Sequence, residues 1–268
     1  MSEVVDISWF QLLLFSSILL IPVGLSYYLK LGIVKEAAVS IVRMTMQLAL
    51  VGVYLEYLFD LNSWWVNLIW LVVMIAIGAN SVISKAKLPQ RPLLAPISLS
   101  LGITAIPLVL LICALVIKPS PLFSAQYLIP IAGMLLGNCL SCNIVALQNL
   151  FGAFEQRKSE YEGALSLGAS PQYASAPFIR SAIQKAISPI MASMATTGIV
   201  TLPGMMTGQI LGGASPMIAI KYQLMIMIAI FVMMISSLTI ALHLSLKSSL
   251  NKEGRVTIRF INKGSDTP

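Results

Sequence analysis

Charged side chains are scarce in this sequence. Of its 268 residues only 10% are Asp, Glu, Lys or Arg, and 57% are hydrophobic, whereas a soluble domain has about a quarter of its residues charged. Apolar runs of roughly 20 residues recur along the chain, which is the length that a helix needs to cross a bilayer. The shortage of charge therefore argues against a soluble globular protein and indicates a polytopic membrane protein.

The sequence also lacks the motifs on which several enzyme classes depend. It has no Gly-x-x-x-x-Gly-Lys-Ser/Thr loop for nucleotide phosphates and no His-Glu-x-x-His zinc motif. The predicted membrane spans contain no Asp, and their one Glu, Glu56, lies near a span edge, so paired carboxylates for intramembrane proteolysis are missing. The single histidine, His243, lies near the end of the last span, where an interfacial role is the commoner one. We therefore expect no catalytic residues in this chain.

The apolar runs predict an all-α fold with about seven transmembrane helices. They are continuous rather than alternating, which favours helices over barrel strands. The first run is too long for a signal-peptide core and no small-residue cleavage site follows it, so we interpret it as a retained span. We expect residues 1–268 to form a single transmembrane domain. The predicted spans are Ser8–Leu29, Val39–Phe59, Val66–Ile83, Leu94–Ile117, Tyr127–Leu150, Ile187–Leu202 and Ala219–Leu246.

Basic residues are distributed unevenly between the two sides of this seven-span model. All 17 except Lys118 and Lys221 fall on one side. The positive-inside rule then predicts an outside N-terminus and a cytoplasmic C-terminus in a plasma membrane, which would be the inner membrane of a Gram-negative source. Because the basic residues follow this distribution, the net charge of +7 does not indicate a nucleic-acid partner. The distribution assigns the basic tail, residues 247–268, to orientation and to contact with lipid headgroups.

Polar residues within the spans are candidates for a translocation path. Arg43 and Gln47 lie one turn apart in the second span; Arg43 is either a functional buried charge or a side chain that reaches the headgroups. Asn138 follows Gly133-x-x-x-Gly137 in the fifth span, where the two glycines would let another helix approach closely.

Hydroxyl residues mark the sixth span. Ser193, Thr197 and Thr201 recur at every fourth residue and form one stripe. Such a stripe either packs against a neighbouring helix, which is the commoner case, or faces a passage. Thr197 is therefore a further candidate for the translocation path.

Leu202–Gly213 follows this span and is rich in Pro, Gly and Met. These residues do not favour a regular helix, and irregular backbone at membrane depth is tolerated where it is buried in protein or lines a cavity. Interrupted helices mark gates or substrate sites in transporters, although a plain extracytoplasmic connection would have a similar composition. We favour the gate. Its candidate residues are Pro203, Gly204, Met205, Met206, Thr207, Gly208 and Gln209.

Sulfur-containing side chains are the candidates for metal ligation. Cys139 and Cys142 have Cys-x-x-Cys spacing, which could hold a soft metal. A buried cysteine is more often a small apolar residue, however, and methionine is ordinary packing in membrane helices. Met205 and Met206 would likewise suit soft cations. The sequence leaves the metal ligands undetermined.

The longest polar segment, about residues 151–185, lies between the fifth and sixth spans. Gly168 is a typical helix stop, and Ser170-Pro171 is a typical N-cap followed by proline at the first helical position. We expect a short helix, a sharp break and a second helix that leads into the sixth span. A short helix on the cytoplasmic face is suited to docking in a groove of a partner.

This segment resembles the coupling helix of ABC-transporter permeases. Their motif runs Glu-Ala-Ala, three residues, then Gly, and this chain has Glu162-Gly163-Ala164, three residues, then Gly168. Gly163 departs from the usual Ala. The resemblance implies contact with an ATPase. The residues implied are Glu160, Glu162, Gly163, Ala164, Leu165, Leu167, Gly168 and Ala169.

A closer resemblance, to the FetB-like permease family of bacterial iron exporters and plant aluminium-tolerance proteins, covers most of the chain. It rests on Arg43–Leu48, Ile129–Asn138, Leu202–Gly213 and Tyr222-Gln223. It implies a homodimeric permease that exports a metal, with iron as the first candidate, and ATP and Mg²⁺ bound by a separate cytoplasmic ATPase. Another cargo, such as another metal or a sugar nucleotide, and a non-pumping channel or regulatory protein are the alternatives.

Overall fold

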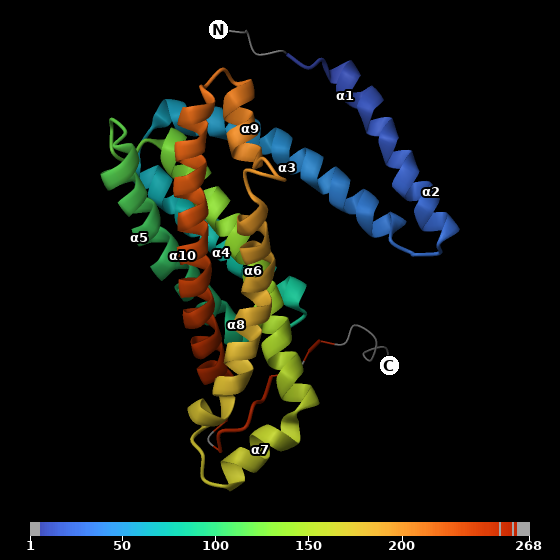
Figure 1. Ribbon diagram of the computed structural model, residues 1–268, viewed down its shortest axis with the longest axis vertical. Coiled ribbons are helices and arrows are strands. Elements are labelled where there is room, and N and C mark those ends of the chain that lie inside the picture. Colours follow the sequence, from blue (N-terminus) through green and yellow to red (C-terminus); the bar gives the residue numbers. More distant parts are fainter. Residues whose placement is uncertain (1–5, 252, 259, 262–268) are drawn as a thin grey trace.

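The computed structural model describes residues 6–251, 253–258 and 260–261, and within these ranges the chain forms helices and no strand (Figure 1). A 3₁₀ turn, Ser17–Leu19, joins α1 to α2, and a π-helical turn, Ile112–Ile117, extends α5. The helices are α1 (Trp9–Ser16), α2 (Leu20–Tyr28), α3 (Val34–Leu61), α4 (Trp64–Ala86), α5 (Gln90–Leu111), α6 (Ala125–Gln156), α7 (Lys158–Ser166), α8 (Pro171–Thr196), α9 (Gly204–Leu211) and α10 (Pro216–Ser249).

Six helical segments of the described chain are long and apolar enough to cross a membrane. They correspond to the first five predicted spans and the last, which confirms an all-helical, integral membrane protein. The segments are Trp9–Tyr28, Val34–Leu61, Trp64–Ala86, Gln90–Ile117, Ala125–Gln156 and Pro216–Ser249.

The predicted sixth span, Ile187–Leu202, has the wrong bounds. Helix α8 starts earlier, at Pro171, and ends at Thr196. Beyond it the backbone turns at Gly198, which has φ +88° and bonds through its N–H to the carbonyl of Thr201 at 2.8 Å. Helix α8 runs from the end of the bundle that carries α7 to the end that carries α9 (Figure 1). It is less apolar than the six segments because it carries Arg180 and Lys185 near its middle.

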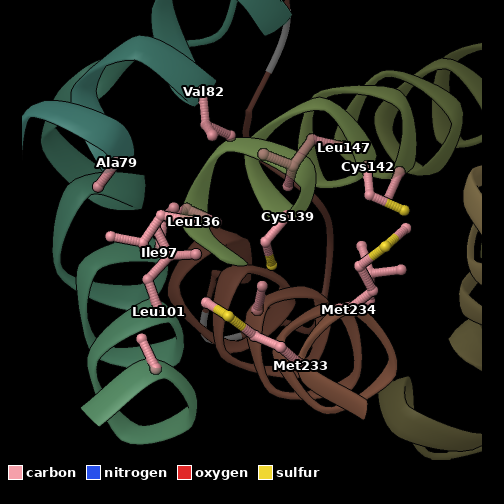
Figure 2. Packing of buried hydrophobic residues seen from close by; sticks show 14 of the residues in the cluster. Ala79, Val82, Ile97, Leu101, Leu136, Cys139, Cys142, Leu147, Met233 and Met234 are labelled. Carbon is pink, nitrogen blue, oxygen red and sulfur yellow. The ribbon is translucent and has the colours of Figure 1, made fainter. Parts of the chain in front are cut away.

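The core lies among α4, α5, α6 and α10, and α8 packs against α6 and α10. Figure 2 shows its apolar side chains meeting between these helices, with Cys139 of α6 directed toward Met233 of α10. Among the glycines inside the described helices, Gly78 of α4 has the closest neighbour, because a Cβ atom there would lie 3.0 Å from Cδ2 of Leu140. Gly133 and Gly137, which we expected to let another helix approach closely, are less crowded within the chain: a Cβ at Gly133 would meet only the Met74 methyl group, 3.6 Å away, and one at Gly137 would meet no atom within 4 Å.

Helices α1, α2 and α3 stand apart from the other helices (Figure 1). In α3 the only buried residue is Leu58, near its end. The helix is attached there through Asn62, whose Oδ1 accepts a hydrogen bond of 3.0 Å from the N–H of Ala125 at the start of α6. Tyr54, Leu55 and Phe59 also pack against the core near this end, and most of the remaining apolar surface of α3 is open to lipid or to another protein chain.

Candidate functional site

The short polar segment folds as a helix, a break and a second helix, as expected. Helix α7 ends in a left-handed turn at Gly168, which has φ +90°. The N–H groups of Gly168 and Ala169 close the turn on the carbonyls of Leu165 and Ala164, both at 3.0 Å. Ser170 then caps α8 by accepting a hydrogen bond from the N–H of Tyr173, and proline follows at the first helical position.

An aromatic cluster holds α7 against the ends of its two neighbours. The Phe154 ring of α6 stacks on Phe178 of α8 with a centroid distance of 4.8 Å, and the Tyr161 ring of α7 meets Phe154 edge-on at 5.0 Å. The guanidinium of Arg157 lies 4.8 Å from the Phe178 ring centroid. Such aromatic and cation–π pairs add to ordinary burial. They therefore fix α7 relative to α6 and α8.

The chain beyond α10 runs along the side of α7 that faces the bundle (Figure 1). The Tyr161 hydroxyl donates a hydrogen bond of 2.8 Å to the carbonyl of Gly254, and burial raises the pKa of this phenol, which keeps it protonated. Gly254 has φ +77°, and a Cβ there would lie 2.8 Å from Cγ of Pro171. Further along, Ile258 is buried and the N–H of Ile261 bonds to the carbonyl of Lys87.

This packing gives the basic tail a structural role in addition to the orientation and lipid contact expected of it. The part described, up to Ile261, joins α7, α8 and the α4–α5 connection; Lys252, Arg259 and residues 262–268 lie outside the described residues. Sequence reasoning missed this contact because the tail is short and polar. Gly254, at a position that requires a left-handed backbone, was its one available signal.

The predicted coupling residues divide into two faces of α7. Ala164, Leu165 and Ala169 pack against the core. Glu160, Gly163, Leu167 and Gly168 are exposed, and Glu162 is half-buried. Leu167 is 91% exposed. Glu160 pairs with Arg157, and Glu162 lies 3.7 Å from the Nζ of Lys158. A partner could reach this exposed face, on which Leu167 lies close to charged side chains.

The predicted path residues are not brought to one site within the chain. Arg43 and Gln47 are exposed on α3, away from the other candidates (Figure 1). Asn138 lines a hollow of about 330 Å³ between α6 and α8, together with Cys142 and Ser193. Its amide donates a bond of 2.9 Å to the carbonyl of Met134.

A second hollow, of about 380 Å³, lies where α8, α9 and α10 meet. Three methionines, Met194, Met206 and Met227, line it with Thr197 and Pro203. The amide of Gln223, which sequence reasoning did not select for this role, also lines it; this side chain is 7% exposed and its Oε1 has no partner among the described residues.

The expectation of irregular backbone through Leu202–Gly213 is wrong for most of the segment. Gly204–Leu211 is helix α9, which starts directly after Pro203. A proline before the first turn loses no intrahelical bond, and the N–H of Thr207 bonds to the Pro203 carbonyl at 3.0 Å. The helix carries Met205, Gly208 and Gln209 of the predicted gate, and the Oε1 of Gln209 is buried without a described partner.

The two cysteines are buried in α6 and pack as apolar residues against α10 and α8. Figure 2 shows Cys139 directed toward Met233 and Cys142 toward Met234. The Cys142 thiol also lies 2.9 Å from the carbonyl of Ala186. Within the described residues no three His, Cys, Asp or Glu side chains are grouped so that they could hold a metal ion.

Comparison with known proteins identifies relatives along nearly the whole chain. The model of the "Uncharacterised protein family (UPF0014)" matches residues 9–250. The chain is 34% identical to "Protein ALUMINUM SENSITIVE 3" of Arabidopsis thaliana, over 78% of this chain and 76% of that protein. It is 29% identical to "Probable iron export permease protein FetB" of Escherichia coli, over 92% and 93%. It is 33% identical to "UPF0014 membrane protein YjkA" of Bacillus subtilis, over 77% and 81%. No solved structure matches the chain.

Proposed function

The chain belongs to the UPF0014 family of membrane proteins, and on this basis we propose that it is the permease subunit of an ABC transporter that exports a metal ion, with iron as the first candidate. ATP and Mg²⁺ would bind to a separate cytoplasmic ATPase, since this sequence has no phosphate-binding loop. The cargo is inferred from the relative named as a probable iron export permease.

The observation that carries the proposal is the geometry of α7. This helix lies beyond the end of the bundle (Figure 1). Tyr161 holds its inner side through the hydrogen bond to Gly254. Leu167, the residue directly after the helix, is almost fully exposed. A lone apolar side chain at the tip of an anchored helix suits insertion into a groove of a partner. Glu160 and Glu162 on the same segment would add polar contacts.

Helix α7 is also placed to transmit force. Only Arg157 separates it from α6, and only the turn around Gly168 separates it from α8. These two helices form the walls of the hollow lined by Asn138 and Ser193. A push on α7 by a closing ATPase would therefore act on both walls at once.

A homodimer would complete the permease. Helix α3 has 28 residues, of which only Leu58 is buried in the single chain, and it exposes Arg43 and Gln47. Lipid can cover the apolar part of this surface, but a guanidinium and an amide at membrane depth favour protein or water as neighbours. A second copy packed here would enclose these polar groups.

The cargo contacts of one chain would come from neutral groups. The hollow at α9 offers thioethers and the free Oε1 of Gln223, and the described residues contain no cluster of carboxylate, imidazole and thiolate ligands. Neutral ligands hold a metal ion weakly enough for release, which a conducting path requires.

Transport in proteoliposomes tests the proposal. The chain is co-purified with its ATPase partner and reconstituted, and movement of ⁵⁵Fe is followed with ATP, with ADP, and with Leu167→Asn in place of the wild type. We expect ATP-dependent transport that Leu167→Asn reduces at least tenfold while the fold, monitored by thermal unfolding, is retained. Ile199→Asn is the matched control, because Ile199 is 90% exposed at the opposite end of α8.

Iron flux that persists without ATP would instead identify a channel. Iron levels that are unchanged in cells lacking the gene, under iron or peroxide stress, would reject iron as the cargo. Failure of the chain to bind any ATPase would reject the ABC permease itself.

A further inference from the structure

A groove between α8 and α10, near the α7 end of the bundle, combines apolar walls with basic side chains. Its volume is about 510 Å³. Ile179 and Ile183 of α8 and Leu246 of α10 form apolar walls, while Arg180 and Lys247 project from the two facing helices. Nothing in the coupling or transport roles of the chain requires two cations at this place.

Neither cation is neutralised within the described part of the chain. The salt bridges there join Arg157 to Glu160, Lys158 to Glu162 and Arg255 to Glu253, and none includes Arg180 or Lys247. His243 also lines the groove, with its Nδ1 held 2.7 Å from the carbonyl of Thr239, and the other polar lining residues, Gln172, Ser175 and Gln184, carry no charge. The groove therefore places positive charge beside largely apolar walls. This combination suits a ligand that has an anionic head and an apolar tail.

The position of the groove matches a headgroup layer. Lys247 lies in the last turn of α10, where the helix leaves its apolar stretch, and Arg180 lies about 14 Å along α8 from its start. From there the apolar wall continues along α8 toward Ile183. Basic pockets of this kind between transmembrane helices bind lipid headgroups.

We propose that this groove is a binding site for one anionic phospholipid from the leaflet that faces α7. The phosphate would lie between Arg180 and Lys247, and the start of an acyl chain would cover Ile179, Ile183 and Leu246. A soluble phosphate ion would satisfy the cations but leave these apolar side chains in water, which is why a lipid is the better occupant. The proposal does not depend on the cargo or on the ATPase.

Lipid binding by the delipidated protein tests the site. Native mass spectrometry in detergent follows the addition of phosphatidylglycerol or phosphatidylcholine to the full-length chain. We expect one phosphatidylglycerol to be retained at low lipid concentration, and binding of this lipid to weaken about tenfold or more in Arg180→Gln/Lys247→Gln. The matched control, Lys85→Gln/Lys185→Gln, removes the same charge from exposed side chains outside the groove and should bind within about twofold of the wild type.

A second variant separates loss of the site from loss of the fold. Ile183→Trp fills the apolar part of the groove and keeps both cations, so it should also weaken phosphatidylglycerol binding while leaving the thermal unfolding of the lipid-free protein within a few degrees.

Equal binding of the two lipids, or equal losses in the two double variants, would overturn the proposal. Competition by inorganic phosphate at the same concentration as the lipid would identify a soluble anion site instead. Loss of ATPase binding with unchanged lipid binding in Arg180→Gln/Lys247→Gln would identify the groove as a protein contact.

Discussion

The hydroxyl of Tyr161 in α7 donates a hydrogen bond to the backbone carbonyl of Gly254, 93 residues further along the chain. Through this bond the segment after α10 supports the inner face of α7 while the outer face stays free. A helix that must transmit force needs such support, because otherwise a push on it would be absorbed by its own displacement. The contact thus links the C-terminal segment to the proposed coupling of the permease.

Tyr161→Phe removes this bond and keeps the aromatic packing on Phe154. We expect the free energy of unfolding to fall by about 1 kcal/mol, because a buried carbonyl loses its donor. Transport per ATP hydrolysed should fall as well, since α7 is less firmly held. Tyr173→Phe, at a 78% exposed position, is the control and should change neither quantity. Unchanged unfolding and transport in Tyr161→Phe would show that the bond contributes nothing in the membrane.

Gly254→Ala should release the C-terminal segment from α7. The left-handed backbone costs a non-glycine residue about 1–2 kcal/mol, and the new Cβ would lie 2.8 Å from Cγ of Pro171. We expect faster limited proteolysis of the segment after Ser249 and a lower melting temperature. Gly32→Ala is the matched control, since Gly32 also has positive φ but no atom within 4 Å of an added Cβ. Equal proteolysis of the two variants would contradict the close contact.

Sequence reasoning reached the membrane fold and the local form of α7, because both depend on features that act over short range. Apolar runs of spanning length predict helices in lipid, and Gly168 with Ser170-Pro171 predicts the break by backbone chemistry alone. Tertiary contacts could not be predicted from the sequence in this way. Nothing local places Gly254 against Tyr161, or selects Gly78 rather than Gly133 for close approach.

The misjudged segment around Pro203 shows the same limit. Its composition disfavours a helix, yet α9 forms because packing against α10 outweighs a propensity cost of about 1 kcal/mol per glycine. The predicted path residues had a different difficulty: Arg43 and Asn138 lie on separate parts of one chain. Under the proposed homodimer, a second copy would bring them together, and no single sequence describes that contact.

Asn143→Ala should loosen α6 from α10. The Asn143 amide donates to the hydroxyl of Ser237 at 3.1 Å and to the thiol of Cys139 at 3.3 Å. Interhelical bonds in membrane proteins contribute about 0.6–2 kcal/mol, so we expect a loss of about that size in thermal or denaturant unfolding. Asn149→Ala is the control, because Asn149 bonds to the backbone of Val145 in its own helix. A larger loss in Asn149→Ala would contradict the assignment of Asn143 as the link between helices.

The two glycines of the coupling segment should respond in opposite directions to the same substitution. At Gly163, within α7, an added Cβ meets no atom within 4 Å. Gly163→Ala should therefore raise stability by about 0.5–1 kcal/mol through helix propensity, with transport retained. At Gly168 space is equally open but φ is +90°, so Gly168→Ala should lower stability by about 1–2 kcal/mol. It should also reduce transport per ATP, because the turn that orients α7 against α8 is strained.

Gly168→Asn, which tolerates a left-handed backbone better, should recover part of both losses. Thermal unfolding and ATP-coupled flux, measured together on the three variants, check the expectation. Reduced coupling in Gly163→Ala with normal coupling in Gly168→Ala would show that the flexibility of α7, and not the turn after it, governs transmission.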